Sequence, residues 1–343
     1  MKNLYFDNWI HGKIGLNEGD VLTRNNLSSY QLDSLVNTIR FAKENSSFYS
    51  DLYKNINPDR DITILSDISK LPFIDEQTLQ NTGQGMSCVP ASQVSRIVTM
   101  ETSGSTGTPK RIFFTPEDQE LMIDFVHHCI APIAGEGDIF LILMPCEIPG
   151  SVGDLVRIGL ERRGAKTIPY GILPFDGSSD EELLKMMKGK GVKSMLATPS
   201  AAFRLALSAE KAPQFEMKSI LLSGEYVTDE MIEKMESAWN CKVFEHYGMT
   251  ESGLGGAVAC TSHVGYHPRE ADLLYEIINP TSGEVLPDGE YGELVFTTLT
   301  RKAMPFIRFR TGDFSSFITE PCPCGSVLRR LSRVGSRKVI KGY

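Results

Sequence analysis

The sequence predicts an α/β protein with parallel sheets flanked by helices and a smaller antiparallel, barrel-like subdomain. Two patterns along the chain carry this prediction. Short apolar runs alternate with helix-like segments up to residue 254, which is typical of parallel sheets covered by helices. From residue 255 onward, strand-like runs are separated by Gly/Pro turns, which favours antiparallel pairing. We therefore expect a core over residues 1–254 and a subdomain over residues 255–343, with no long linker between them.

Two helices are indicated in the first part of the chain. The first is marked by apolar residues at helical spacing, and its end is expected at residues 44–47, ENSS; the apolar residues are Leu32, Leu35, Val36, Ile39 and Ala42. Thr115 and Pro116 are typical of a second helix start, because threonine caps a first turn and proline fits its first position. Glu117 and Asp118 follow, where the helix dipole favours negative charge.

Four buried strands are indicated further along the chain. Their apolar runs span residues 138–145, 192–199, 217–225 and 241–248. Helix-like sequence follows the strands; for example, Thr228 is a candidate N-cap for the segment DEMIEKMESAW. This alternation is the basis for the parallel sheet.

Composition and charge disfavour several classes of protein. The chain has 343 residues and a formal net charge of −8, which argues against nucleic-acid binding as its main function. It has no run of about 18 apolar residues and no apolar signal at its start, so we expect neither a membrane span nor secretion. Seven cysteines without a secretory context favour a reducing, cytoplasmic location and no disulfide framework.

The segment TSGSTGTPKR, residues 102–111, is the first candidate for binding chemistry. It is not a Walker A motif, because Gly104 and Gly107 are too close together and Lys110 is followed by arginine. Its small residues still allow backbone N–H groups and hydroxyls to surround phosphate oxygens, with Lys110 supplying charge. The segment is therefore a candidate phosphate loop, and a flexible linker is the alternative.

Three further polar segments end predicted strands or lie in turns. HYGMTES, residues 246–252, brings together an aromatic ring, a glycine, a hydroxyl and a carboxylate that could bind Mg²⁺. FRTGD, residues 309–313, places Asp313 in a tight Gly turn, where it could accept the hydroxyls of a ribose. SGE, residues 223–225, ends another strand. Because ligands of open α/β sheets bind beyond the carboxyl ends of the strands, we expect these groups to converge.

The motifs TSGSTGTPK, YGMTE and RTGD, in this order and at these separations, together resemble the signature of adenylate-forming enzymes. This superfamily includes acyl- and aryl-CoA synthetases, the adenylation domains of peptide synthetases, and luciferase. The segment SSFY after the first helix and the late CPCG resemble the phenylacetate–CoA ligase branch. The resemblance covers nearly the whole chain. It implies the large N-terminal domain of that superfamily and ATP-dependent (AMP-forming) activation of a carboxylic acid.

The resemblance also implies roles for individual residues. The β- and γ-phosphates of ATP would be held by the loop and its lysine: Ser103, Gly104, Ser105, Thr106, Gly107, Thr108 and Lys110. Thr250 would contact the α-phosphate and Glu251 would bind Mg²⁺. The other nucleotide contacts would be Tyr247 on adenine, Gly224 and Glu225 in the adenine pocket, Asp313 on the ribose, and Arg337 near the hinge. The acid would lie between residues 144–154, residues 198–200 and Gly248.

Cysteine and histidine residues form a second candidate site. Cys322 and Cys324 lie in the segment PCPCG, and Cys260 and His267 are seven positions apart. Three thiolates and one imidazole suit tetrahedral zinc, although the spacing is not that of a standard finger. The phenylacetate–CoA ligase branch is similar here. His263 is the competing ligand, and unpaired surface thiols are the alternative. The remaining cysteines are expected in the core: Cys88, Cys129, Cys146 and Cys241.

The resemblance sets further expectations for the reaction. The relatives carry a mobile C-terminal lid domain with a catalytic lysine, and we expect this chain to lack it, because Tyr343 stands where that domain would begin. Transfer of the acyl group to CoA, a carrier protein or an amine would then need outside help, such as a separate lid-domain protein. The alternative is a non-enzymatic protein that sequesters or senses an adenylate or a carboxylic acid. The intact Thr250, Glu251 and Asp313 favour the enzyme.

Overall fold

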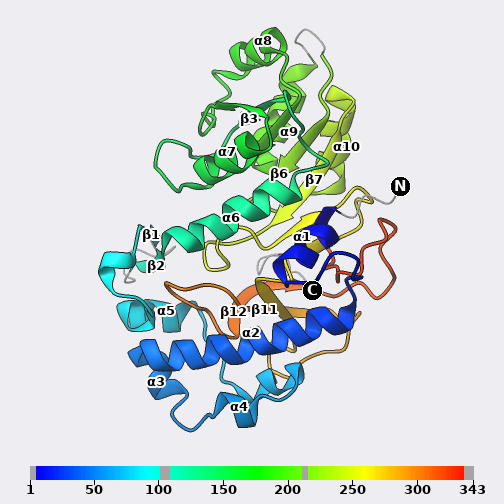
Figure 1. Cartoon of the computed structure of the whole chain (residues 1–343). Helices are drawn as coiled ribbons and strands as arrows, with labels where there is room; N and C mark the ends of the chain where they lie inside the picture. The colour runs from blue at the N-terminus through cyan, green and yellow to red at the C-terminus, as the bar shows by residue number, and fades with distance from the viewer. Residues whose placement is uncertain (1–4, 101–108, 211–214, 336–343) are drawn as a thin grey trace. The chain divides into compact units, whose positions relative to one another are not determined.

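The structure, a computed structural model, describes residues 5–100, 109–210 and 215–335. The chain divides into two compact units (Figure 1). The first unit comprises Met1–Glu120, Thr250–Gly256 and His267–Tyr343, and the second comprises Leu121–Met249 and Ala257–Tyr266. No helix within the described ranges combines the length and the hydrophobicity that a membrane crossing requires.

Parallel strands form the centre of the second unit. They lie in the order β4-β3-β5-β6-β7, and each neighbouring pair is parallel. Their bounds are Ile139–Ile142 for β3, Lys166–Pro169 for β4, Ser194–Ala197 for β5, Ser219–Leu222 for β6 and Lys242–Tyr247 for β7. β7 pairs antiparallel with β8, Ala257–Ala259, and the sheet order ends with β9, Tyr266–Pro268. The four predicted strands are confirmed. β4 was not predicted, because two of its four residues are exposed and the other two are only partly buried.

Alternating side chains along these strands build the core of the second unit. Leu141, Met195 and Ile220 point to one face, where three helices cover them: α8 (Asp180–Lys190), α9 (Pro199–Ala209) and α10 (Asp229–Trp239). The helices contribute Leu183, Leu184, Met187, Ala202, Leu205, Ala206, Met235 and Trp239. On the other face, the buried hydroxyls of Ser194 and Ser219 both donate to the carbonyl of Ile133, at 2.9 and 2.8 Å. Apolar burial thus stabilises the sheet while its few polar groups stay satisfied.

Two further helices of the fold meet at a glycine. These are α6, Pro116–Cys129, and α7, Val152–Arg162. A Cβ atom at Gly159 of α7 would lie 2.7 Å from Cγ1 of Val126 on α6. Because real Cβ contacts are never that short, a larger residue at this position would force the helices apart.

Helix starts lie where the capping residues predicted them. α6 begins at Pro116 and α10 at Asp229, and Thr228 caps α10 by accepting a hydrogen bond from the N–H of Met231 at 3.2 Å. At α6, the Thr115 hydroxyl accepts from the N–H of Asp118 at 3.2 Å, and the Asp118 carboxylate accepts from the N–H of Thr115 at 3.0 Å. These reciprocal bonds form a capping box, which satisfies donors at the helix start.

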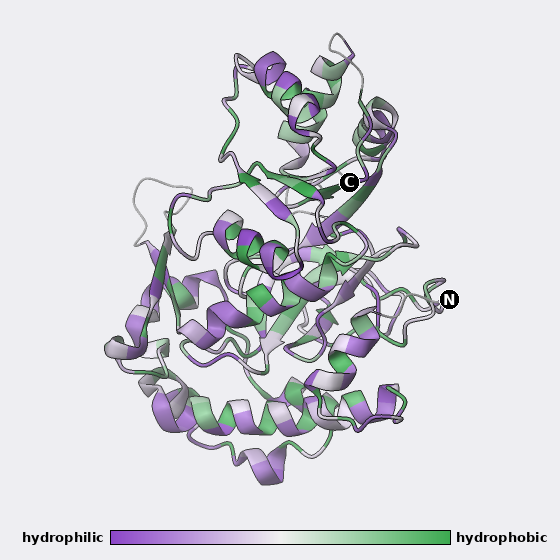
Figure 2. Cartoon of the chain, turned by 45° about the horizontal axis from the view of Figure 1, so that its top comes forward, coloured by the Kyte–Doolittle hydropathy of each residue, from purple (hydrophilic) through white to green (hydrophobic). Residues whose placement is uncertain are grey.

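Helices of the N-terminal part belong to the first unit. They are α1 (Tyr5–Lys13), α2 (Arg24–Asn45), α3 (Ser47–Leu52), α4 (Pro58–Asp61) and α5 (Glu76–Thr82), with 3₁₀ turns at Leu65–Lys70, Gly83–Met86 and Ala91–Gln93. α2 is the predicted amphipathic helix and ends where the sequence indicated, but it starts earlier because Thr23 and Asn26 form a capping box. The helices in Figure 2 carry alternating hydrophobic and hydrophilic bands, as expected of helices with one buried face.

Two antiparallel sheets complete the first unit. β10 (Leu273–Ile278), β11 (Gly292–Thr298) and β12 (Phe309–Ser315) form one sheet, which confirms the antiparallel pairing expected after residue 255. β1 (Arg96–Met100) and β2 (Lys110–Phe114) form the other. The sequence did not indicate β1. Its pairing joins the two flanks of the candidate phosphate loop, with Met100 opposite Lys110.

The RTGD motif lies within a strand, so the prediction of a tight turn at Asp313 is wrong. β12 contains the whole motif, and its register with β11 shifts between Glu293 and Val295. Gly312 has a φ of +70°, and its N–H donates to Glu293 Oε1 at 3.1 Å. The glycine therefore serves a β-bulge, which re-aims the residue beside it.

Asp118 is expected to be a major stabilising residue of the first unit. Its carboxylate accepts hydrogen bonds from the N–H groups of Thr115, Lys302 and Ala303 at 3.0, 2.7 and 2.9 Å. Asp118→Ala leaves these buried donors without an acceptor, so the free energy of unfolding should fall by about 3 kcal/mol in urea denaturation. The control Glu117→Ala, an exposed acid in the same helical turn, should cost less than about 1 kcal/mol. Equal losses in the two variants would contradict this assignment.

Candidate active site

A buried ion pair joins two of the predicted site residues in the first unit. Lys110 is the first residue of β2, and Glu251 lies in the turn that follows β7. The Nζ atom of Lys110 is 2.7 Å from Glu251 Oε1 and 3.2 Å from Oε1 of Glu76, the first residue of α5. The side chains of Lys110 and Glu251 are 11% and 1% exposed. The structure thus brings together two residues that are far apart in the sequence.

The surroundings keep the Lys110 ammonium charged. Burial lowers the pKa of Lys110, but the charges and hydrogen bonds of Glu251 and Glu76 raise it more, so the pKa lies above its ordinary value. The site therefore holds a fixed positive charge beside a buried carboxylate.

The second carboxylate oxygen of Glu251 is unused. Oε2 is buried and has no hydrogen-bond partner in the part of the chain that the structure describes. Such an oxygen has lost water without gaining a donor, which is uncommon in folded proteins. A cation or donor supplied by a ligand would satisfy it.

Two buried arginines hold the backbone that carries Glu251. Nη1 of Arg301 donates to the carbonyl of Glu251 at 2.7 Å. Nη2 of Arg269 donates to the carbonyl of Ser252, also at 2.7 Å. The N–H of Gly253 donates to the carbonyl of Thr250 at 3.0 Å, which closes the turn. Three successive carbonyls of this turn are therefore fixed by hydrogen bonds.

The Arg301 guanidinium packs against two aromatic rings. It lies over the rings of Phe114 and Phe306, 4.3 and 5.2 Å from their centroids. Burial lowers the pKa of Arg301 to about 10, and the charges of Asp118 and Glu251 oppose that shift, so the group remains charged at neutral pH. The sequence motifs did not indicate Arg301 or Arg269. For Arg301, the available signal was the basic pair Arg301 and Lys302 inside the otherwise uncharged run TTLTRKAMPFI.

Asp313 also belongs to the first unit. Its half-buried side chain extends from the bulge of β12, and its N–H donates to the Thr311 hydroxyl at 3.0 Å. That hydroxyl in turn donates to the carbonyl of Leu294 on β11 at 2.7 Å. The backbone around Asp313 is therefore held by its neighbouring strand.

The remaining described residues of the predicted nucleotide site lie in the second unit. Gly224 and Glu225 follow β6, while Tyr247 and Gly248 stand at the end of the neighbouring parallel strand β7. The predicted adenine-contacting residues therefore lie at the carboxyl ends of two neighbouring parallel strands, which is where ligands of open α/β sheets commonly bind. The phosphate-loop residues Ser103, Gly104, Ser105, Thr106, Gly107 and Thr108, together with Arg337, lie outside the described residues.

The Glu225 carboxylate occupies the N-terminus of α9. Its Oε2 atom accepts from the N–H of Ser200 at 3.0 Å, and its Oε1 atom accepts from the Ser200 hydroxyl at 3.0 Å. Ser200 is the second residue of α9, where unpaired N–H groups and the helix dipole favour an anion. Residues 198–200, expected beside the acid, therefore already contact a carboxylate of the protein.

The four predicted zinc ligands form a cluster. The ligand atoms of Cys260, His267, Cys322 and Cys324 all lie within 4.8 Å of one another. Nδ1 of His267 is 3.1 Å from the carbonyl of Arg329, and Nε2 is 3.5 Å from the Cys324 sulfur. The carbonyl contact orients the ring so that Nε2 faces the Cys324 sulfur, and a histidine that binds a metal is commonly held in this way through its other ring nitrogen.

The competing ligand and the other cysteines have different surroundings. Nδ1 of His263 is 2.9 Å from the carbonyl of Val243, and His263 is not part of the cluster. Cys88, Cys129 and Cys241 are buried, as expected, whereas Cys146 is only partly buried. Burial raises the pKa of the Cys88 and Cys241 thiols to about 12, so both are protonated and unreactive at neutral pH.

Comparisons with known proteins identify the family. Residues 43–299 match the family described as AMP-binding enzyme. The chain belongs to the AMP-binding enzyme family. It is 30% identical to the phenylacetate–coenzyme A ligase of Aromatoleum evansii, over 93% of this chain and 73% of that protein. It is 29% identical to the phenylacetate–coenzyme A ligase of Pseudomonas putida, over 92% of this chain and 72% of that protein.

A solved structure shows the same fold. The 2-hydroxyisobutyryl-CoA ligase, in an open conformation in complex with 2-HIB-AMP and CoA, matches with a TM-score of 0.81 at 21% identity. The match covers 92% of this chain and 71% of that one. This match confirms the expected fold, that of the N-terminal domain of adenylate-forming ligases. The two phenylacetate–coenzyme A ligases confirm the expected resemblance to that branch.

The ion pair between Lys110 and Glu251 should make a pH-dependent contribution to folding stability, which a variant without the Lys110 charge measures. Lys110→Met leaves the buried Glu251 carboxylate without a cation, so stability at pH 7 should fall by about 3 kcal/mol. The pKa of Lys110 in the folded chain lies above its unfolded value of 10.5. The wild type should therefore exceed the variant in free energy of unfolding by the full amount below pH 10.5. This difference should shrink as the pH rises through the pKa of Lys110 in the folded chain.

Urea denaturation at pH 7, 9 and 11 measures this difference. The control Lys188→Met, at an exposed position of α8, should change stability by less than about 0.5 kcal/mol at every pH. A wild-type advantage that stays constant up to pH 11 would show that the ion pair does not supply it.

Proposed function

We propose that this protein activates a small carboxylic acid with ATP, forming an acyl-adenylate and releasing pyrophosphate. The buried pair of Lys110 and Glu251, with one carboxylate oxygen unused, carries the proposal. An oxygen of the acid would attack the α-phosphorus of ATP, and the bond from that phosphorus to pyrophosphate would break. Such transfers depend mainly on positioning and on charge neutralisation, which these residues can supply.

Glu251 fits the role of a magnesium ligand. Its Oε2 atom is a hard, anionic oxygen, and proteins commonly hold Mg²⁺ with one or two carboxylates besides the substrate phosphates. Magnesium bound there would neutralise charge on the phosphates. Lys110 would add a second positive charge beside the β- and γ-phosphates, which the loop Ser103–Thr108 would hold.

The other nucleotide contacts follow the motif positions. Asp313, supported by the bulge of β12, would accept the ribose hydroxyls. Thr250 would contact the α-phosphate, and Arg337 would also reach the nucleotide. In the second unit, Tyr247 would stack on adenine, and Gly224 and Glu225 would line the adenine pocket.

An aryl acid is the substrate class that the relatives support. Phenylacetate–coenzyme A ligases match most of this chain at about 30% identity. Residues 144–154 and Gly248 would lie beside the acid. Coenzyme A is the acceptor that the names of these relatives indicate; a carrier protein, an amine, or a separate lid-domain protein that assists the transfer are the alternatives.

The cysteine and histidine cluster fits a structural zinc ion. Cys260, Cys322 and Cys324 supply three thiols, and His267 supplies one imidazole whose ring is oriented by a carbonyl. This ligand set is typical of closed, tetrahedral zinc sites. Zinc would stabilise the fold here by cross-linking the turn at residues 322–324 to His267.

Carboxylate-dependent ATP–pyrophosphate exchange tests the activity. With a panel of aryl and alkyl acids, the purified chain should show exchange with at least one of them. Glu251→Gln should lower the exchange rate by about 10²-fold or more, because the buried charge that would hold magnesium is lost. Glu76→Gln removes the other, more exposed partner of Lys110 and should lower the rate only a few-fold. Measurable acid binding without any exchange would instead support the non-enzymatic alternative.

Metal analysis tests the zinc site. Purified protein should contain about one zinc per chain, and the double variant Cys322→Ser, Cys324→Ser should contain none. Cys146→Ser should retain the metal, because Cys146 lies outside the cluster. A chelator should lower the melting temperature of the wild type but not that of the double variant. A metal-free wild type with full stability would refute the site.

A further inference from the structure

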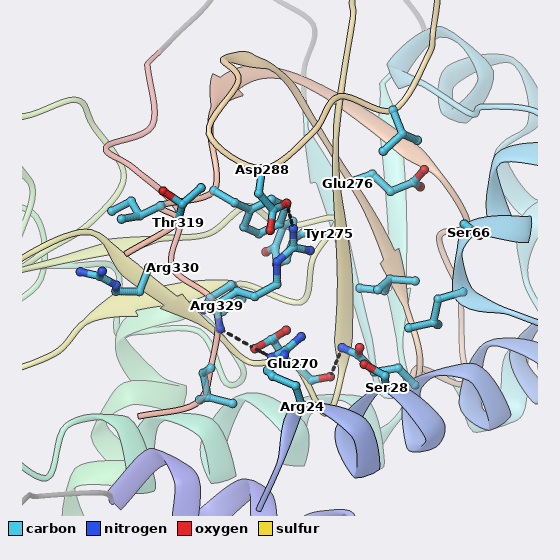
Figure 3. Close-up of a pocket in the computed structure, with 18 of the residues that line it drawn as sticks. Arg24, Ser28, Ser66, Glu270, Tyr275, Glu276, Asp288, Thr319, Arg329 and Arg330 are labelled. Atoms are coloured by element: carbon cyan, nitrogen blue, oxygen red, sulfur yellow. Dashed lines mark hydrogen bonds and ion pairs between the residues drawn. The ribbon is translucent and has the colours of Figure 1, made fainter. Parts of the chain in front are cut away.

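A polar pocket in the first unit is lined by none of Lys110, Glu251 and Asp313. Its volume is about 1090 Å³, which is ample for a small organic ligand. The walls come from α2, from the 3₁₀ turn at Leu65–Lys70, from β10, from the turn at residues 282–288 and from the segment at residues 317–330. Figure 3 shows that charged side chains from these elements face one another across the pocket.

Glu270 organises the cationic wall of the pocket. Its Oε2 atom accepts hydrogen bonds from Nη1 of Arg24 at 2.6 Å and from the backbone N–H of Arg329 at 2.9 Å. The Glu270 side chain is only 6% exposed, and its own carbonyl accepts from Nε2 of Gln31 at 2.8 Å. One buried carboxylate thus holds the guanidinium of Arg24 and the backbone of Arg329 (Figure 3).

Both arginines retain unused donors. The Arg329 guanidinium lies 3.3 Å from the centroid of the Phe317 ring and pairs with Asp288 through Nη2 alone. Arg24 uses only Nη1. Within the described ranges, the other guanidinium nitrogens of these residues make no hydrogen bond. Burial lowers the pKa of Arg329 and the charge of Arg24 lowers it further, although Asp288 and Glu270 oppose this.

The same pocket contains a buried hydroxyl without a partner. Tyr275 of β10 lines it beside Arg329 and is 5% exposed, and its hydroxyl makes no hydrogen bond to the described residues. Three lining acids, Glu284, Asp288 and Glu320, are exposed. The pocket therefore combines an inner set of donors with an acidic rim.

We propose that this pocket binds a small phosphate monoester whose organic part carries hydroxyl groups. Two guanidinium groups and a tyrosine hydroxyl match the three terminal oxygens of a phosphate better than the two oxygens of a carboxylate. Of the exposed acids, Asp288 pairs with Arg329, whereas Glu284 and Glu320 can accept hydrogen bonds from hydroxyl groups of the organic part. The pocket is also much larger than a free phosphate ion, so the organic part has room within it.

Isothermal titration calorimetry of the whole chain with ribose 5-phosphate tests the proposal. One equivalent should bind, inorganic phosphate should bind at least about tenfold more weakly, and ribose should give no measurable heat. Arg24→Gln should weaken binding by about tenfold or more, because a charge-assisted hydrogen bond is lost. Tyr275→Phe should weaken it about fivefold. Ser66→Ala, an exposed position on the opposite wall, is the matched control and should leave the affinity unchanged.

The outcomes separate this proposal from the nucleotide site. Arg24 is partly exposed at the start of α2, so its replacement should not unfold the chain, and circular dichroism of each variant checks this. Asp313→Ala should retain binding of ribose 5-phosphate. Loss of binding in Asp313→Ala, unchanged affinity in both Arg24→Gln and Tyr275→Phe, or no binding by the folded wild type would overturn the proposal. Binding by a chain that shows no pyrophosphate exchange would still support it.

Discussion

The hydrogen bonds from Arg301 and Arg269 to the turn after β7 are the constraint on which the candidate chemistry of the first unit depends. A buried guanidinium must keep its acceptors, because a charge left unpaired in the interior is strongly destabilising. The turn therefore cannot shift without breaking these contacts. This fixes the Glu251 carboxylate beside Lys110 before any ligand arrives, which is the kind of preorganisation that electrostatic catalysis requires.

Local patterns in the sequence were sufficient for most of the second unit. Four of its strands were visible as apolar runs, and Thr228 marked the start of α10, because both signals depend on neighbouring residues. β4 was missed since it has no fully buried residue. The pairing of β1 with β2 was missed as well, because a strand pair depends on residues across an intervening loop and not on one apolar run.

The first unit shows why sequence motifs locate a site but do not describe it. The motifs YGMTE and RTGD indicated Glu251 and Asp313, yet the bulge around Gly312 depends on pairing with β11. Arg301 lies 50 positions from the carbonyl that it holds, so no local pattern could link the two. The cysteine and histidine cluster was indicated by its residue types and by the resemblance to the phenylacetate–CoA ligase branch. The spacing is not that of a standard finger, so the sequence left His263 open as a competing ligand, and only the folded chain shows that His267 belongs to the cluster.

The Glu225 carboxylate accepts the hydrogen bonds that Ser200 could otherwise donate to the carboxylate of a free acid. A tethered carboxylate acts at an effective concentration on the order of millimolar or higher, because its own chain holds it near the helix. A free acid that sought the same N–H and hydroxyl of Ser200 would have to displace it. The α9 terminus would therefore discriminate against weakly held acids, and only those with additional contacts to their organic part would gain access to it.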